Sequence, residues 1–166
     1  MAEFRVERRE AVDYIALPVR TTMEDLAARV GEAFGELDVY LEQRGAETIG
    51  AGAIRYRSVT VEAPFTVEVA HAVANVPRVR DPYLVGRLDA GMYAVAEQRG
   101  PYSWIGGLTQ ELMSWGDAQG LDYAVALGDG TRPDVWDCWF EYYPDSPSEG
   151  PQGLEGGVQV CVLLRT

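Results

Sequence analysis

The chain has 166 residues, of which 47% are hydrophobic and 24% charged, and its formal net charge is −12. This length is enough for one well-buried core and too short for two independent domains, so we predict a single domain over residues 1–166. The 14 basic residues are scattered along an acidic chain that would repel a phosphate backbone, which argues against direct nucleic-acid binding.

No apolar run approaches the ~20 residues that a membrane span needs, and the first ten residues, MAEFRVERRE, carry charge where a signal peptide needs apolar residues. We therefore predict a cytoplasmic protein with no membrane partner. Cys138 and Cys161 lie outside any CxxC pattern, which favours reduced, buried thiols. The single histidine, His71, lies in a strand-like run and is expected to be structural. No metal-ligand pattern or phosphate loop is present, so we expect neither metal nor cofactor.

The first half of the chain predicts the order β-α-β-β. Strand-like residues DYIALPVR precede a helix, in which Leu26, Val30, Phe34, Leu37 and Leu41 recur at helical spacing. A capping box, Thr22 with Asp25, is expected before this helix and Gly45 after it. The runs AGAIRYRSVT and APFTVEVAHAV then predict two strands.

The second half predicts the same order. LDAGMYAVAEQ is strand-like, and a helix with Ile105, Leu108, Leu112 and Trp115 on one face stops at Gly120. VWDCWFEYY and GGVQVCVLLR follow as strands.

Two such halves indicate a duplication, with one repeat at about 3–75, the other at about 84–165, and residues 75–86 as the crossover. Modules of this size rarely bury their apolar faces alone. We therefore predict an α+β fold, in which duplicated β-α-β-β units form one antiparallel sheet with two helices on one face. A ligand cleft is expected at the pseudo-twofold junction of the repeats.

The stretch WDCWFEYYPD places one carboxylate, Glu141, among aromatic rings. Alternation along a strand puts Trp139, Glu141 and Tyr143 on one face, with Asp137, and puts Trp136, Cys138, Phe140 and Tyr142 on the other. Two interpretations stay open at this point. Either Glu141 points to solvent from an open sheet, or it lies in a cavity with acidic and aromatic walls, which would suit a large flat cation.

At the level of motifs, the chain resembles the GyrI-like small-molecule-binding family, which includes the effector-binding domains of multidrug transcription regulators. LDAGMYAVAEQRGPY leads into the second helix, LMSWGDAQGL ends it, and a late Glu-x-Tyr strand follows as FEYYPDSP. The resemblance extends from about residue 3 to 165. It implies a cleft for bulky, often cationic aromatic compounds with Glu141 at its base and Tyr143 two residues on.

The resemblance also implies aromatic walls for this cleft, and a stand-alone version of the family, because no DNA-binding domain precedes the first strand. Gln98 stands where relatives often have histidine. The expected ligand-binding residues are Glu141, Tyr143, Trp139, Tyr56, Tyr93, Tyr102 and Trp104.

Two functions follow from this resemblance. The first is a drug-sensing or drug-sequestering module for amphipathic, cationic aromatic compounds. The alternative is a hydrolase that opens the cyclopropane ring of alkylating natural products, with Glu141 acting on water and Tyr143 or Tyr56 donating to the substrate oxygen. A third possibility is a module that binds a protein partner through its acidic surface.

Overall fold

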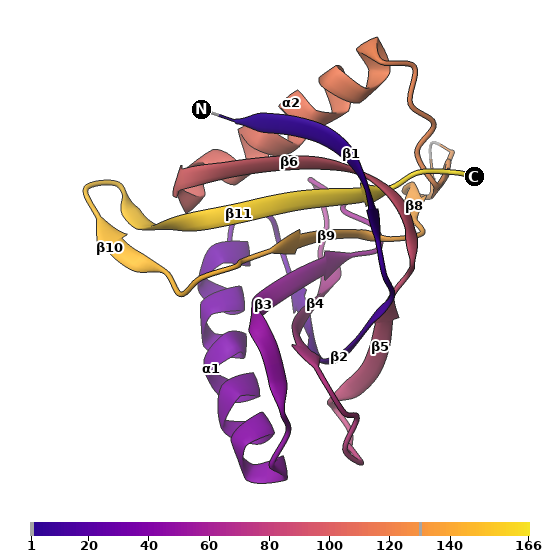
Figure 1. The fold of residues 1–166 in the computed structure, drawn as a ribbon. Helices are drawn as coiled ribbons and strands as arrows, with labels where there is room; N and C mark the ends of the chain where they lie inside the picture. Colours follow the sequence, from indigo (N-terminus) through magenta and orange to yellow (C-terminus); the bar gives the residue numbers. More distant parts are fainter. Residues whose placement is uncertain (1, 130) are drawn as a thin grey trace.

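Most of the chain folds into one antiparallel sheet with the strand order β1-β6-β11-β9-β3-β4-β2-β5, and β10 pairs with β11. The computed structural model describes residues 2–129 and 131–166, with only the backbone of Ala51 (Figure 1). The elements are β1 (Glu3–Arg9), β2 (Val12–Thr21), α1 (Leu26–Arg44), β3 (Thr48–Tyr56), β4 (Phe65–Val73), β5 (Leu84–Leu88), β6 (Gly91–Pro101), a 3₁₀ turn (Tyr102–Trp104), α2 (Ile105–Ala118), β7 (Val125–Ala126), β8 (Val135–Trp136), β9 (Trp139–Tyr142), β10 (Ser148–Gly150) and β11 (Gly153–Leu163).

The predicted α+β class, the single antiparallel sheet and the two helices on one face are confirmed. β2-α1-β3-β4 and β6-α2-β9-β11 are the two β-α-β-β units, and β3 pairs with β9 where the units meet. The first helix begins at Leu26 and is closed by Gly45, whose φ of 65° is the left-handed conformation that glycine adopts without a Cβ clash. Thr22 Oγ1 accepts a hydrogen bond from the Asp25 N–H, 3.3 Å away, in the turn before the helix.

The sheet is strongly curled, and the chain connectivity requires it. β1 and β2 are six positions apart in the sheet order, or about 29 Å in a flat sheet at ~4.8 Å per strand. Only Glu10 and Ala11 connect them, and three Cα–Cα steps reach about 11 Å at most. Asp89 and Ala90 impose the same constraint on β5 and β6. The two ends of the sheet therefore approach one another, as Figure 1 shows where β1 runs into β2 and β6 into β5.

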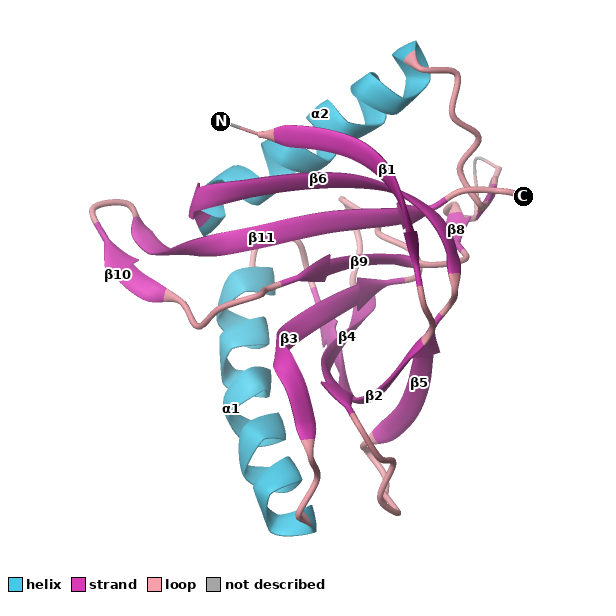
Figure 2. Ribbon diagram, in the orientation of Figure 1, coloured by secondary structure: helices cyan, strands magenta, loops and turns pink. Residues whose placement is uncertain are grey.

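Both faces of the curled sheet are buried. The helices α1 and α2 lie against the outer face (Figure 2). Their side chains pack in two clusters, one that includes Leu37 and another that includes Leu112. The inner face holds a third cluster, which includes Tyr14, Tyr93 and Phe140. Strands buried on both faces are apolar at consecutive positions, as in YIAL of β2 and YAVA of β6. No helix among the described residues has the length and hydropathy to cross a membrane.

The strand registers locate the pseudo-twofold axis. Tyr14 and Tyr93 occupy equivalent places in the first strands of the two units, each 12 residues before the helix start at Leu26 or Ile105. The strand pairing can be followed from Tyr14 to β3 in one unit and from Tyr93 to β9 in the other. Ile54 and Glu141 then occupy equivalent positions in the two units. These two residues are also directly opposite each other. The axis therefore passes between them.

Two details of the strand prediction were wrong. Residues 136–145 are not one strand, because a bend at Asp137 and Cys138 separates β8 from β9. Trp136 consequently packs on the outer face against Trp139, and not with Cys138 and Phe140 on the inner face. The crossover segment 75–86 also contains the start of β5, an edge strand that pairs with β2 of the other unit.

The packing of α1 can be tested with two neighbouring positions. Leu37 is fully buried, and Leu37→Ala should lower the free energy of unfolding by about 3 kcal/mol through lost burial and an unfilled cavity. Val39 lies on the same helix and is 56% exposed, so Val39→Ala should change it by less than about 0.5 kcal/mol. Urea denaturation of both variants measures the difference, and equal losses would contradict the orientation of the helix.

Candidate functional site

Glu141 lies at the junction of the two repeats, on the outer face of β9 beneath the helices. Its side chain is 6% exposed, although a lone ionised carboxylate is costly to bury. The alternative in which Glu141 points to solvent is therefore wrong. Its cross-strand neighbour on β3 is Ile54, so the opposite repeat offers no charged partner at the equivalent position.

Tyrosine hydroxyls are the polar partners of this carboxyl. Tyr143 donates a hydrogen bond to Glu141 Oε1 at 2.7 Å, and Tyr56 is a second hydrogen-bonding partner. Burial raises the pKa of Glu141 to about 7, although both tyrosines act to lower it. Among the described residues, no cationic side chain contributes to this shift. The Glu141 carboxyl therefore changes between its protonated and ionised forms near neutral pH.

Aromatic rings surround the carboxyl. Tyr56 stacks on Trp139 with ring centroids 4.5 Å apart, and Trp139 contacts Trp136 edge-on at 5.6 Å. Tyr143 lies 5.4 Å from the Tyr102 ring. These side chains come from β3, β8, β9 and the turn before α2, so both repeats contribute to the site.

A glycine makes the two halves of the site unequal. By the pseudo-twofold symmetry, Gly52 of β3 occupies the place that Trp139 occupies in β9. The ring of Phe34 from α1 fills the space over Gly52. A Cβ at Gly52 would lie 2.3 Å from Phe34 Cε1, so any larger residue would displace this ring. Phe34 in turn contacts Tyr143 edge-on at 6.3 Å. The side chains thus fill the space where the sequence predicts a cleft.

Two buried donors of the aromatic cluster have no hydrogen-bond partner among the described residues, the indole Nε1–H of Trp139 and the hydroxyl of Tyr102. Buried polar groups of this kind are uncommon in folded proteins. Both belong to rings of the aromatic cluster, so a molecule bound there could accept hydrogen bonds from them.

The structure brings together five of the seven residues expected at the site, namely Glu141, Tyr143, Trp139, Tyr56 and Tyr102. Tyr93 is a correction, because it lies on the inner face, where its hydroxyl donates to the Asp89 carbonyl oxygen at 2.6 Å. Trp104 is 45% exposed and covers Gly100, so it stands apart from the buried cluster.

Sequence reasoning missed Phe34 and Trp136 as members of this site. Phe34 was assigned to the helix core, and the glycine opposite it, Gly52, is the signal that its ring reaches the sheet. Trp136 was placed on the wrong face because the bend before β9 breaks the alternation.

The thiols lie away from the site. Cys138 and Cys161 are both buried, unbonded to each other and on the inner face, as expected of reduced packing residues. His71 is partly buried in β4, and its Nδ1 lies 3.1 Å from the Ala72 carbonyl oxygen. Within residues 2–129 and 131–166, no group of three or more acidic, histidine or cysteine side chains could hold a metal ion.

Comparison with known proteins assigns the architecture to a class. No family model and no curated protein sequence matches the chain. Solved structures do match, and the mixed α+β architecture with one large antiparallel sheet and two helices matches a GyrI-like fold.

Four of these structures illustrate the likeness. The EcmrR C-terminal domain aligns with a TM-score of 0.69 at 11% identity, over 100% of this chain and 99% of that one. SAV2435 bound to tetraphenylphosphonium aligns at 0.63 and 10% identity, over 98% and 94%. A hydrolase from Listeria innocua aligns at 0.58 and 8% identity, over 98% and 92%. In the EcmrR–DNA complex the match covers 99% of this chain but 58% of the EcmrR chain, with a TM-score of 0.75 and 10% identity.

The pKa of Glu141 predicts how stability depends on pH. The carboxyl binds its proton more tightly in the folded chain, with a pKa of about 7 against the usual 4.5, so stability should fall as pH rises between these values. The loss should be about 3 kcal/mol at most, from 1.36 kcal/mol per pKa unit.

Denaturation at a series of pH values, compared between wild type and Glu141→Gln, isolates this contribution. The difference in unfolding free energy between the two proteins should change between pH 4.5 and 7 and then level off. Tyr143→Phe removes a hydrogen bond that lowers the pKa, so it should move the upper end of this window to higher pH. A difference that stays constant with pH would show that folding does not raise the pKa of Glu141.

Proposed function

We propose that the protein binds bulky amphipathic, cationic aromatic compounds at Glu141, as a GyrI-like module for sensing or sequestering drugs in the cytoplasm. The observation that carries this proposal is a buried carboxyl with tyrosine hydroxyls as partners, aromatic rings around it and no balancing cation among the described residues.

The energetics favour a cationic ligand over a neutral one. Among the described residues, no cationic side chain acts on ionised Glu141, so a bound cation would supply the missing charge pairing. The faces of Trp139, Tyr56 and Tyr143 each offer a cation–π contact of ~0.5 to 2 kcal/mol. A flat or multi-ring cation can use several of these contacts together.

Binding requires the aromatic rings to move apart, because they fill the space around the carboxyl. Phe34 comes from α1 and Tyr102 from the turn before α2, so movement of either element would open the site. The free energy of this rearrangement is subtracted from the affinity. SAV2435, which shares the fold, is bound to tetraphenylphosphonium, a cation of the proposed class, and this supports the proposal.

Tetraphenylphosphonium is also a suitable probe, since its own charge is independent of pH. Its affinity should rise up to tenfold per pH unit from pH 5 to about 7, because binding a cation expels the proton from Glu141. Glu141→Gln should weaken binding at pH 8 by at least about tenfold, or 1.4 kcal/mol, and remove the pH dependence. Isothermal titration calorimetry at several pH values measures both effects.

Neutral triphenylphosphine oxide serves as the matched ligand, and Glu149→Gln, at an exposed glutamate on β10, as the matched variant. Neither the neutral ligand in Glu141→Gln nor the cation in Glu149→Gln should lose affinity. Equal affinity of wild type and Glu141→Gln for the cation would refute the role assigned to the charge.

A second function is favoured by a specific observation, the neutral-range pKa of Glu141 beside two tyrosines. A general base is most effective when its pKa lies near the working pH. In a cyclopropane hydrolase, Glu141 would take a proton from water while the water oxygen attacks a ring carbon and one ring C–C bond breaks. The electron pair would move to a conjugated carbonyl oxygen of the substrate, to which Tyr143 or Tyr56 donates a hydrogen bond. Some proteins with this fold are hydrolases, including one from Listeria innocua.

Incubation with a cyclopropane-bearing alkylator tests this second function. Mass spectrometry should detect a product heavier by one water, formed over many turnovers. Glu141→Gln should slow its formation by about 10² to 10⁴, the usual contribution of a general base. Alkylator that remains intact beside wild-type protein that still binds tetraphenylphosphonium would exclude the hydrolase and leave the binding function standing.

A further inference from the structure

A pocket lies on the face of the sheet opposite to Glu141, inside the curl. It has a volume of about 200 Å³, and its walls are mostly apolar, with Ala53, Ala70, Leu88 and Phe140 among them. A cavity of roughly 150 Å³ holds a benzene ring, so this pocket accommodates one aromatic ring with a small substituent. It is separated from Glu141 by the backbone of the central strands.

One wall of the pocket is formed by a buried arginine, Arg55 of β3, which is 4% exposed. Its Nη1 donates to the Tyr14 hydroxyl at 3.1 Å and to the Arg87 carbonyl oxygen at 2.7 Å, and its Nη2 donates to the Asp137 carbonyl oxygen at 2.8 Å. All three acceptors are neutral. Among the ion pairs of the described residues, none includes Arg55.

The guanidinium therefore has unused capacity. It carries five N–H donors, and the three hydrogen bonds leave the Nε–H and one N–H of Nη2. Nε and Nη2 share one edge of the planar group, which is the geometry that a carboxylate binds with two oxygens. Glu141 can become neutral by gaining a proton, whereas an arginine does not lose its proton in a protein. The buried charge of Arg55 therefore persists at every physiological pH.

The nearest carboxylate is already committed. Glu68 is opposite Arg55 on β4. It accepts a hydrogen bond from the Tyr14 hydroxyl and forms an ion pair with Arg57, whose Nε lies 2.7 Å from its Oε2. The two oxygens of Glu68 are thus taken up by Tyr14 and Arg57, and neither forms an ion pair with Arg55.

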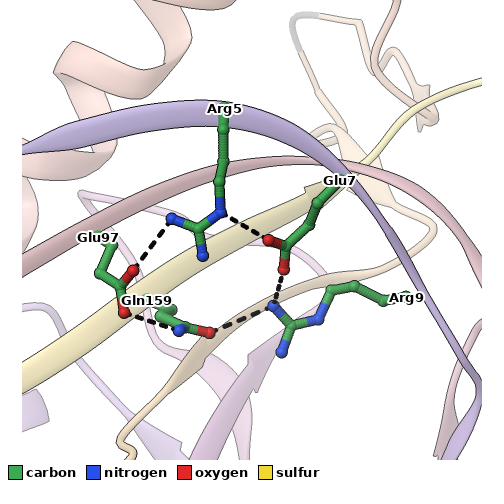
Figure 3. A network of polar contacts seen from close by, with 5 residues as sticks. All are labelled: Arg5, Glu7, Arg9, Glu97 and Gln159. Carbon is green, nitrogen blue, oxygen red and sulfur yellow. Dashed lines mark hydrogen bonds and ion pairs between the residues drawn. The ribbon is translucent and has the colours of Figure 1, made fainter.

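A second arginine, Arg9 of β1, lies in the pocket wall with its Cζ 5.6 Å from the centre of the Phe140 ring. A polar network holds it in place, since its Nη1 donates to Glu7 at 2.7 Å and to Gln159 at 3.2 Å. Arg5 and Glu97 complete this network, and Figure 3 shows the other terminal nitrogen of Arg9 turned away from it. Arg9 is therefore oriented for a further contact.

Two carboxylates, Glu10 and Asp89, also line the pocket, but both residues are exposed. Solvent and salt screen their charge, whereas the charge of Arg55 is buried. The unpartnered N–H groups of this buried guanidinium therefore favour an anionic acceptor deep in the pocket.

We propose that this pocket is a second ligand site, which binds a small aromatic carboxylate. The carboxylate pairs with Arg55, and the ring packs against Phe140 and the small side chains of Ala53 and Ala70. This site is independent of the Glu141 site, because it uses the opposite face and the opposite charge.

Benzoate is the probe, and benzamide is its neutral counterpart of the same shape. Calorimetry should show one benzoate bound per chain, with benzamide at least tenfold weaker. Arg55→Gln should weaken benzoate at least tenfold. Ala72→Phe, which puts a ring into the pocket from a partly exposed position, should do the same without removing a charge. This second variant covers the case in which Arg55→Gln does not fold.

Matched controls locate the binding. Arg20→Gln, at an exposed arginine of β2, and Glu141→Gln should both bind benzoate like wild type. In NMR spectra the Arg55 Nε–H signal should shift on titration, while the Trp139 indole N–H should stay in place. The proposal is overturned if benzoate does not bind, if benzamide binds equally well, if Ala72→Phe has no effect, or if Glu141→Gln abolishes binding.

Discussion

The structure depends on the pairing of β3 with β9, which joins the two repeats into one sheet. Each repeat alone would present an exposed strand edge and an uncovered apolar face. The four residue pairs from Ala53–Tyr142 to Tyr56–Trp139 join the two repeats at the centre of the sheet. At the ends, β1 pairs with β6 and β5 pairs with β2, so each repeat covers one strand edge of the other. The short connectors of these exchanged strands then force the curl, which gives the sheet an inner and an outer core.

The paired strands β3 and β9 also carry two buried charged groups that cannot neutralise each other. Glu141 is opposite Ile54, and Arg55 is opposite Phe140, so the acid and the base occupy adjacent pairs. Successive side chains of a strand point to opposite faces, which places Glu141 beneath the helices and Arg55 inside the curl. Each charge has a separate physical solution. Glu141 takes up a proton near neutral pH, while Arg55 relies on carbonyl oxygens and a tyrosine hydroxyl.

Local patterns in the sequence predicted much of the fold. The helix over 26–44, its closing glycine and the repeated β-α-β-β order all follow from periodicity within a few residues. The outer face of β9 was also predicted correctly, because Trp139 and Glu141 alternate within this short strand and Tyr143, directly after it, continues the alternation. These features are set by neighbours along the chain.

The errors arise where distant segments decide the outcome. Tyr93 lies in a run that is apolar at every position, so alternation could not reveal which face it occupies. The exchange of β1 and β5 between repeats has no local signal. Arg55 was overlooked because it resembles an ordinary charged residue, although an arginine between two buried apolar neighbours, Ile54 and Tyr56, is itself a sign of a functional or structural role.

The position of Glu141 at the pseudo-twofold axis explains why one acid is enough. Ile54 occupies the equivalent place, and an acid there would lie about 5 Å away in Cβ separation, where two carboxylates repel strongly. A single acid on the axis is reached by equivalent tyrosines from both halves, Tyr56 and Tyr143. Symmetry thus supplies two donors to one acceptor, and isoleucine at the equivalent place leaves one carboxyl, whose charge a single cation can balance.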